Sequence, residues 1–285
     1  MTATVSVAER VSGLLDGAGG VAHRLGGGDI CDGYRVELSG GPDGDVFAKT
    51  LAGAPADFFE AEAAGLALLR STGAVAVPEV LAVEPDVLVL DWVPTAAPSA
   101  AEAERLGRDL AALHDTAAPH YGTAGPLYLG PVPLTTPDPP VTDPAGWPAF
   151  HAEHRLLPLL RRAVDGGGIG ERDARDVERL CDRIDDVAGP PQPPAVIHGD
   201  LWSGNILWTG DRPRLIDPAA QGGHPEADLA FLENFGCPHW ERVLGAYEDV
   251  RPLPGRRERA SLHVLHHVLL HAALFGGAYG AECGG

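Results

Sequence analysis

The chain has 285 residues and carries 40 acidic side chains against 21 basic ones, for a formal net charge of −19. This acidic surplus argues against nucleic acid as a partner and is compatible with a cationic substrate. The sequence contains neither an apolar run near the roughly 20 residues that span a bilayer nor a signal-peptide pattern, so it predicts a cytoplasmic protein without membrane contact, which we expect to be a monomer.

The length suffices for two lobes with separate cores, and the N-terminal part predicts a small sheet. The expected elements are a short helix over residues 4–17 and strands over residues 21–25, 34–38 and 45–51. Gly26, Gly27 and Gly28 lie between the first two strands, where missing side chains would let backbone N–H groups approach nucleotide phosphates. A plain glycine-rich hairpin is the alternative, since a lone glycine-rich loop is a weak motif.

Lys49 follows apolar residues near the end of the third expected strand. In kinases, a lysine at this place grips the α- and β-phosphates of ATP and pairs with a glutamate of the next helix. Residues 55–72 predict that helix, which carries both Glu60 and Glu62. We favour Glu62 as the partner of Lys49 and keep Glu60 as the rival.

Residues 75–93 predict two further strands, broken at a Glu-Pro-Asp turn. The second of these strands ends at a proline and is expected to connect the two lobes, with backbone groups of Asp91 and Val93 holding the adenine of a nucleotide. We therefore divide the chain into an N-lobe of residues 1–91 and a C-lobe of residues 92–285.

The C-lobe predicts mainly helices. Helices are expected over residues 99–116, 147–164, 171–187 and 256–275, and a proline-rich irregular segment over residues 117–148. Ser99 is the expected N-cap of the first of these helices, and Glu102 three residues later completes a capping-box pattern. His114, near the end of the same helix, is expected to be structural rather than catalytic.

The chain is organised around one polar stretch in its second half. There Asp200 is followed five residues later by Asn205, and Asp217 comes after two short extended runs, residues 206–208 and 214–216, that flank a turn. Such a hairpin would bring Asp217 back beside Asn205.

This order of residues is typical of phosphotransferases of the protein-kinase type. In these enzymes an aspartate accepts the proton of the attacking hydroxyl, while an asparagine and a second aspartate hold Mg²⁺ across the phosphates of ATP. Asp200, Asn205 and Asp217 stand in that order, and His198 completes the interval H-x-D-x-x-x-x-N. Any one of these residues alone would be interpreted as an ordinary polar loop residue, but the ordered set favours the kinase interpretation.

Two further groups of residues have alternative interpretations. His263, His267 and His271 lie four apart on one face of the last expected helix, as metal-ligating histidines can. Because no carboxylate or cysteine accompanies them there, a polar wall of an acceptor pocket or a packed core is favoured over a metal site. Cys31, near the glycines, is a candidate redox-sensitive thiol, although most lone cysteines are inert.

The whole chain resembles the fructosamine kinase (ketosamine 3-kinase) family, a branch of the aminoglycoside-phosphotransferase-like kinases. The most specific segments are HGDLWSGNILW and LIDPAAQGGHPEADLAFLENFG, supported by GGGDICDGYRV, FFEAEAAGL, LVLDWVP, RLGRDLAALH and LFGGAYG. The wider superfamily shares the HGD-x-x-x-x-N interval and the second aspartate, whereas Trp202 and the DPA…GH-x-E-x-DLA run point to this branch.

The resemblance implies an α+β, bilobal protein-kinase-like fold with an antiparallel-sheet N-lobe and a mainly helical C-lobe. It implies ATP and Mg²⁺ as cofactors, with Asp200 as the catalytic base or hydroxyl-orienting carboxylate. Asn205 and Asp217 would be the Mg²⁺ ligands, and Lys49 with Glu62 would be the pair that grips the phosphates.

Four more residues lie within this stretch or shortly after it. Trp202 would present an aromatic face to a sugar, with the filling of core space as an equal alternative. His224 and Glu226 are candidates for contact with the acceptor substrate. Asp228 is expected to pin the catalytic loop through hydrogen bonds.

The activity implied by the resemblance is ATP-dependent phosphorylation of a sugar hydroxyl on a ketoamine, either free or on a protein lysine, as a repair of glycation. The nearest rival is a kinase for another small acceptor, such as an aminoglycoside, choline or an amino alcohol. A catalytically silent ATP-binding module is disfavoured because Lys49, Asp200, Asn205 and Asp217 are all present.

Overall fold

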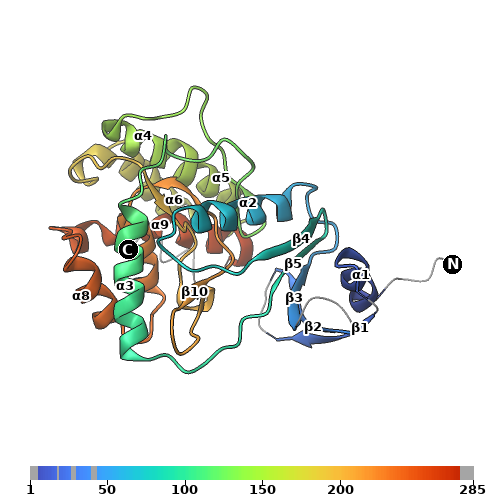
Figure 1. Cartoon of the computed structure of the whole chain (residues 1–285). Coiled ribbons are helices and arrows are strands. Elements are labelled where there is room, and N and C mark those ends of the chain that lie inside the picture. The colour runs from blue at the N-terminus through green and yellow to red at the C-terminus, as the bar shows by residue number, and fades with distance from the viewer. Residues whose placement is uncertain (1–5, 18, 27–29, 40–43, 277–285) are drawn as a thin grey trace.

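The computed structural model describes residues 6–17, 19–26, 30–39 and 44–276. A lobe built on an antiparallel sheet lies at the right of Figure 1, and a larger, mainly helical lobe lies at the left. This architecture confirms the expected α+β, bilobal fold.

The sheet of the smaller lobe has five antiparallel strands in the order β1-β2-β3-β5-β4. Their bounds are β1 Gly20–Leu25, β2 Asp32–Leu38, β3 Asp45–Thr50, β4 Val80–Glu84 and β5 Val87–Asp91. The first three strands lie where the alternation of apolar residues predicts them. The fourth begins later than expected, since Val75 and Val77 are buried in the core outside the sheet and Pro78 cannot donate to a strand ladder.

Strand β5 is buried on both faces, which explains its continuous apolar sequence. Val87 and Val89 face one side and pack against helix α1 (Val7–Leu14). Leu88 and Leu90 alternate to the other side and join the core formed with helix α2 (Phe58–Ser71). The sheet is therefore covered by one helix on each face.

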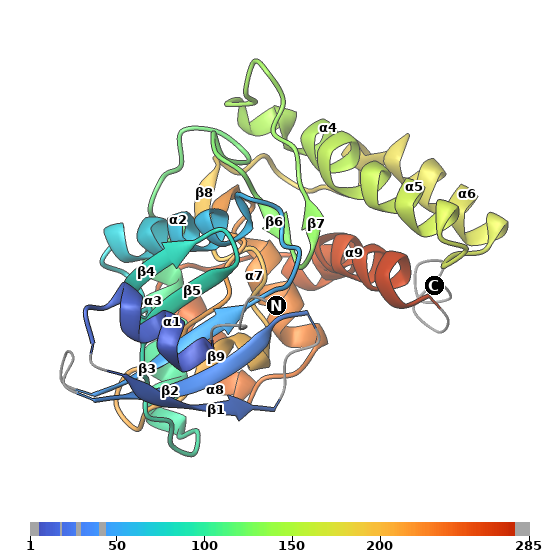
Figure 2. The same cartoon turned by 90° about the vertical axis from the view of Figure 1, so that its right-hand side faces the viewer.

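The larger lobe carries most of the helices. Its main elements are α3 Ala100–His114, β6 Tyr128–Leu129, β7 Val132–Pro133, α4 Trp147–His151, α5 Leu157–Asp165, α6 Glu171–Cys181, β8 Ala195–Ile197, β9 Ile206–Leu207, β10 Arg214–Leu215, β11 Gln221–Gly223, α7 Glu226–Asn234, α8 Trp240–Glu248 and α9 Arg256–Phe275. Figure 2 shows α4, α5 and α6 together at the upper right, with α9 beneath them.

Two of the expected helices differ most from the structure. The helix expected over residues 147–164 runs from α4 to α5 through a π-helical turn, Ala152–Leu156. Pro158, in the first turn of α5, has no N–H with which to continue an α-helical ladder, and the wider turn precedes it. The helix expected over residues 171–187 ends at Cys181, with a short 3₁₀ turn after it.

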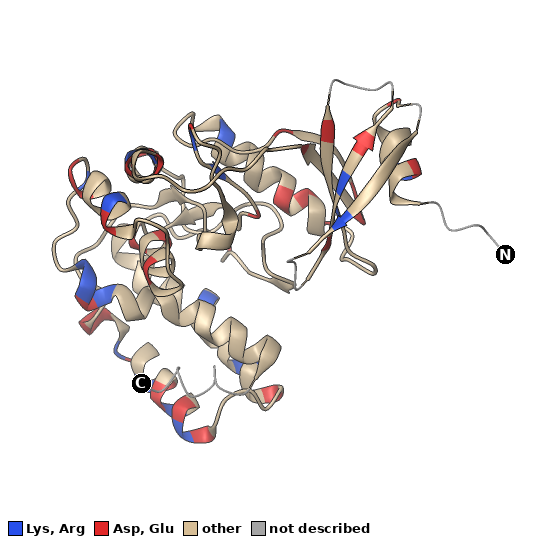
Figure 3. Ribbon diagram, turned by 90° about the horizontal axis from the view of Figure 1, so that it is seen from below, with Lys and Arg blue, Asp and Glu red and all other residues tan. Residues whose placement is uncertain are grey.

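Charged residues of both signs lie close together on the outer helices, and the drawn lysine and arginine residues do not form a continuous basic track (Figure 3). On α6, for example, Arg175 pairs with Glu171, and Arg179 pairs with Asp176. Among the described helices, none has the length and apolar character needed to cross a membrane.

Candidate active site

The catalytic loop between β8 and β9 is tied together by its own polar groups. The backbone N–H of Asp200 lies 3.3 Å from Nδ1 of His198, and Nε2 of His198 lies 3.0 Å from the backbone oxygen of Ile216. The buried imidazole therefore joins the loop to the residue that directly follows β10 and precedes Asp217. Burial lowers the pKa of His198, which keeps the ring neutral, as this pattern of one accepted and one donated hydrogen bond requires.

Asp228, on α7, pins the same loop, as the sequence predicts. Its carboxylate accepts hydrogen bonds from the backbone N–H groups of His198, at 2.7 Å, and Gly199, at 2.9 Å. His114 lies 3.1 Å from the same carboxylate and 2.9 Å from the hydroxyl of Tyr247, which confirms its structural role. Burial acts to raise the pKa of Asp228, but these hydrogen bonds outweigh it and lower the pKa.

The hairpin of β9 and β10 brings the ends of the motif together. Its strands pair antiparallel, and the backbone N–H of Ile216 donates to the backbone oxygen of Asn205 at 3.1 Å. Asp217, the next residue after Ile216, therefore lies close to Asn205. The amide nitrogen of Asn205 donates to the backbone oxygen of Asp200 at 2.8 Å, so the amide oxygen points away from that group.

Glu102 supports the turn of this hairpin rather than completing a capping box. Ser99 is the N-cap as expected, because its hydroxyl accepts the backbone N–H of Glu102. The carboxylate of Glu102, however, accepts hydrogen bonds from the backbone N–H groups of Thr209 and Gly210, both at 3.0 Å. The buried glutamate thus connects the start of α3 to the turn that orients Asp217.

Replacing Glu102 with alanine is expected to lower the free energy of unfolding by about 1–3 kcal/mol, because two turn N–H groups lose a charged acceptor. Glutamine, which keeps one carbonyl oxygen, should recover much of the loss. Chemical denaturation measures both variants. Glu104→Ala is the control: Glu104 lies on the same helix as Glu102, its exposed ion pair with Arg242 of α8 would be lost, and the change should cost less than about 1 kcal/mol. Equal effects of Glu102→Ala and Glu104→Ala would contradict the assigned contact.

Lys49 lies between two carboxylates, one from each lobe. Its Nζ is 2.8 Å from Oε2 of Glu62 and 3.1 Å from Oδ1 of Asp217. The structure thus pairs Lys49 with Glu62, the favoured glutamate, whereas Glu60 is exposed. Asp217 has a φ of 54°, a left-handed conformation that non-glycine residues adopt rarely and that recurs at functional sites.

The charges of this trio shift one another's pKa values. Burial acts to lower the pKa of Lys49, but Asp217 and Glu62 outweigh it, and the pKa is raised. Burial raises the pKa of Glu62, which Lys49 opposes and the charge of Asp217 reinforces. Burial also acts to raise the pKa of Asp217, but Lys49 lowers it. The lysine is therefore charged, and Asp217 is the carboxylate that stays ionised most readily.

The trio and Asn205 fit a magnesium ion and a nucleotide. Asp217 and Asn205 offer carboxylate and amide oxygens, which are the ligands that Mg²⁺ prefers. A cation at Asp217 would compensate the excess negative charge that two carboxylates, buried Glu62 and partly exposed Asp217, place around one lysine. Lys49 would then be free to face the phosphates while Glu62 holds it.

The structure describes only some of the other residues that the sequence predicts to bind the nucleotide. Gly26 follows β1, but Gly27 and Gly28 lie outside the described residues. Asp91, at the end of β5, uses its side chain in an ion pair with Arg214 on β10, at 3.0 Å, and Val93 is buried. These contacts fix the segment between the lobes, and adenine binding by its backbone stays a prediction.

Trp202 is an exposed aromatic residue two positions after Asp200. Its side chain is 41% exposed, so the alternative that it fills core space is wrong. The indole lies over Gly204, where an added Cβ would collide with the ring. A flat aromatic surface is thus held in the open beside the catalytic loop.

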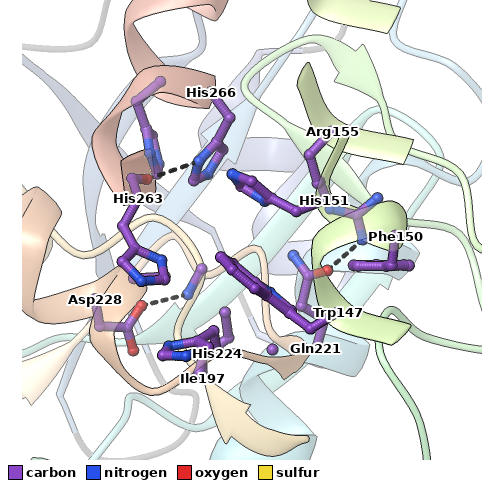
Figure 4. A pocket seen from close by; sticks show the side chains of 14 residues that line it. Trp147, Phe150, His151, Arg155, Ile197, Gln221, His224, Asp228, His263 and His266 are labelled. Atoms are coloured by element: carbon purple, nitrogen blue, oxygen red, sulfur yellow. Dashed lines mark hydrogen bonds between the residues drawn. The ribbon is translucent and has the colours of Figure 1, made fainter. Parts of the chain in front are cut away.

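His224 and Glu226 are both buried rather than at the surface, and Figure 4 shows His224 among the residues that line an interior cavity. Glu226 accepts two hydrogen bonds from Arg259, one of them at 2.9 Å, and lies 3.4 Å from Nε2 of His263. Trp147 packs against both His224 and His263. This burial favours structural roles for both residues over direct contact with an acceptor, with Glu226 in an ion pair with Arg259.

The same residues form a possible ligand set for a metal ion, since single ligand atoms of His224, Glu226 and His263 lie within 4.8 Å of one another. It differs from the histidine face that the sequence suggests, because His271 bonds instead to the backbone oxygen of His267. Arg259 occupies both oxygens of the Glu226 carboxylate and already neutralises its charge. We therefore interpret the set as a network around the Glu226–Arg259 ion pair rather than as a metal site.

The interior around this network is rich in neutral histidines. Burial lowers the pKa of His151 to about 3 and holds those of His224 and His266 well below the usual value. A cavity of about 30 Å³, room for about one water molecule, lies among these rings and next to Gly199 of the catalytic loop. The side of the cavity formed by these three histidines is thus polar but uncharged.

Cys31 has a protected thiol. It is half-buried, and burial raises its pKa to about 11, although the charge of Lys49 opposes this shift. A thiol with a raised pKa contains little of the reactive thiolate at neutral pH. The structure therefore favours the inert alternative for Cys31.

His267 contacts the catalytic loop in a way that the sequence does not reveal. Its Nε2 lies 3.4 Å from Oδ1 of Asp200. The spacing of the histidines on α9 shows that His267 shares a face with His263, but it cannot show which loop that face meets.

Comparison with known proteins gives consistent results. A family model described as fructosamine kinase matches residues 17–284. A probable ketoamine kinase of Thermus thermophilus is 36% identical over 264 residues, which cover 92% of this chain and 91% of that protein. A probable ketoamine kinase of Escherichia coli K12 is 34% identical over 267 residues, which cover 90% of this chain and 88% of that protein.

Solved structures agree with this match. The crystal structure of a candidate fructosamine-3-kinase from Thermobifida fusca aligns with a TM-score of 0.88 and 43% identity, covering 99% of this chain and 96% of that one. The streptomycin–ATP–APH(2″)-IIa ternary complex aligns with a TM-score of 0.64 at 12% identity, over 99% and 95% of the two chains, and shows a shared fold alone. Since the family model covers nearly the whole sequence and both ketoamine kinases exceed 30% identity over most of it, the chain belongs to the fructosamine kinase family.

Proposed function

We propose that the protein is an ATP-dependent kinase that phosphorylates a sugar hydroxyl of a ketoamine, such as a fructosamine or ribulosamine adduct of an amine. The observation that carries this proposal is the meeting of Asp200, Asn205 and Asp217 with the Lys49–Glu62 pair in one site of a fructosamine kinase family member. Relatives named ketoamine kinase and protein-ribulosamine 3-kinase support the choice of acceptor.

Each residue has a defined part in the reaction. Asp200 accepts the proton of the acceptor hydroxyl while the hydroxyl oxygen attacks the γ-phosphorus of ATP. The bond between that phosphorus and the leaving oxygen of ADP breaks. Lys49, held by Glu62, neutralises charge on the α- and β-phosphates. Asn205 and Asp217 hold Mg²⁺, which supplies further neutralisation of phosphate charge when bound. Asp228 and Glu102 keep the loop and the hairpin in register through backbone hydrogen bonds.

Trp202 is proposed to stack on the sugar of the acceptor. Replacing Trp202 with alanine is expected to raise the KM for the ketoamine about 10-fold, because a stacked aromatic surface is lost. The KM for ATP should stay unchanged, and Trp202→Phe, which keeps an aromatic face, should retain most of the affinity. Steady-state kinetics with each substrate varied in turn measure this. A rise in the KM for ATP instead would place Trp202 on the nucleotide side.

The acceptor is tested with a panel of fructosyl-lysine, ribulosyl-lysine, kanamycin and choline, each offered with Mg²⁺ and ATP. We expect turnover of the ketoamines and loss of that turnover in Asp200→Asn. Turnover of kanamycin or choline alone would leave the site intact and overturn the acceptor. ATP binding without transfer to any acceptor would favour a catalytically silent module.

We further propose that the enzyme repairs glycated amines, free or on protein lysines, and works as a monomer in the cytoplasm. Support comes from the free thiols of Cys31, Cys181 and Cys237, which suit a reducing compartment. Size-exclusion chromatography with light scattering tests the monomer, for which a mass of 29.7 kDa is expected.

A further inference from the structure

His267 lies where the last helix meets the proposed catalytic base. The residue is on α9, and its Nε2 is 3.4 Å from Oδ1 of Asp200. The imidazole is 2% exposed, whereas the Asp200 side chain is 24% exposed. The carboxylate therefore has a solvent side, where an acceptor hydroxyl can approach, and an inner side that faces the imidazole.

The ring of His267 is held firmly in this position. It stacks on Phe231 of α7, with ring centroids 3.4 Å apart and planes 15° apart. On another side it contacts His266, with ring centroids 3.9 Å apart. A side chain locked between two rings can orient a neighbouring group without first losing rotational freedom.

The ring nitrogens of His267 are buried polar atoms. Within the described ranges, neither Nδ1 nor Nε2 makes a hydrogen bond, and a buried polar group without a partner is costly. The nearby acceptor is Oδ1 of Asp200, just beyond ordinary hydrogen-bond length. Contacts of catalytic groups are often long in the free enzyme and shorten when substrate binds.

The two oxygens of Asp200 have different neighbours. Oδ2 lies 3.3 Å from the amide nitrogen of Asn205, and Oδ1 lies near His267. Asn205 comes from the catalytic loop itself, while His267 comes from a separate helix. Together they would fix the plane of the carboxylate, which a base needs in order to meet the hydroxyl in line with the γ-phosphate.

We propose that His267 is a positioning residue, which donates a hydrogen bond from Nε2 to Oδ1 of Asp200 and holds the carboxylate towards the acceptor hydroxyl. The inference rests on the proposed function, since it needs Asp200 to act as the base. It differs from a packing role, in which the imidazole only fills space against Phe231.

Three substitutions of His267 separate these roles. His267→Phe keeps an aromatic ring against Phe231 and removes the donor. His267→Gln carries an amide N–H at about the reach of Nε2, whereas His267→Asn is polar but too short. We expect kcat to fall about 10- to 100-fold in the Phe and Asn variants and to stay within about 5-fold of wild type in the Gln variant, with KM values for ATP and acceptor within about 3-fold.

His266→Phe is the matched control, because phenylalanine keeps an aromatic ring against His267, and Nδ1 of His266 bonds to the backbone oxygen of His263 rather than to Asp200. Its kcat should stay within about 3-fold of wild type. Thermal melting checks that each variant is folded. Should His267→Phe fail to fold, the comparison of Gln with Asn decides the question.

A double-mutant cycle with Asp200→Asn completes the test. If His267 acts through the carboxylate, His267→Phe should not lower the residual activity of Asp200→Asn further. An equal loss in both backgrounds, a rise in KM without a fall in kcat, or no difference between Gln and Asn would overturn the inference. Wild-type enzyme that phosphorylates no ketoamine would count against the proposed function instead, and any acceptor it does consume serves for the same cycle.

Discussion

Replacing Asp200 with asparagine is expected to lower kcat about 10²- to 10⁴-fold, with little change in the KM for ATP. Asparagine keeps the size of the side chain, but it cannot take the proton of the acceptor hydroxyl. The neighbours of the Asp200 carboxylate are Asn205 and His267. Steady-state kinetics with a consumed acceptor measure the loss.

Asp211→Asn is the control for this variant. Asp211 lies exposed in the turn between β9 and β10, close in sequence to the site but outside the proposed machinery. Its kcat should remain within about 2-fold of wild type. A kcat for Asp200→Asn near that of Asp211→Asn would remove Asp200 from its role as base.

Replacing Asp217 with asparagine is expected to cause a loss of about 10³-fold or more in kcat at ordinary Mg²⁺ concentrations. The variant removes the carboxylate that lies 3.1 Å from Lys49 and is proposed to hold the metal. Metal-assisted neutralisation of the phosphates is worth several kcal/mol, and each 1.36 kcal/mol is a factor of ten in rate. The Mg²⁺ concentration needed for half-maximal activity should also rise.

A titration of activity with Mg²⁺ measures both effects of Asp217→Asn. Asp86→Asn is the matched control, because Asp86, in the turn between β4 and β5, is also a partly exposed aspartate, and its ion pair is with Arg10 of α1 rather than with Lys49. It should leave the Mg²⁺ dependence unchanged. An unchanged Mg²⁺ dependence in Asp217→Asn would show that the metal is held elsewhere.

Local patterns in the sequence predict much of the fold. Alternating apolar residues locate β1, β2 and β3 to within two residues, and the turn chemistry between residues 206 and 216 predicts the hairpin of β9 and β10. These features depend on neighbours in the chain, so the sequence carries their signal directly. Helical periodicity agrees with the choice of Glu62 over Glu60, since of these two glutamates only Glu62 lies on the buried face of α2.

Contacts between distant segments could not be predicted in the same way. Glu102 stands in a valid capping-box pattern, yet its carboxylate bonds to a turn 107 residues further along the chain. His224 and Glu226 follow the catalytic stretch in sequence, but the fold turns them into the interior, towards Trp147 and Arg259. Polar residues have several ways to be satisfied, and only tertiary packing chooses among them.

The measurement that tests the central claim most directly is phosphorus NMR of a reaction containing wild-type protein, Mg²⁺, ATP and fructosyl-lysine. We expect one new phosphomonoester signal on the sugar, growing in equal amount with ADP, and no such signal with Asp200→Asn. ADP that accumulates with free phosphate and no sugar phosphate, or ATP that stays unchanged, would contradict the assignment of this chain as a ketoamine kinase.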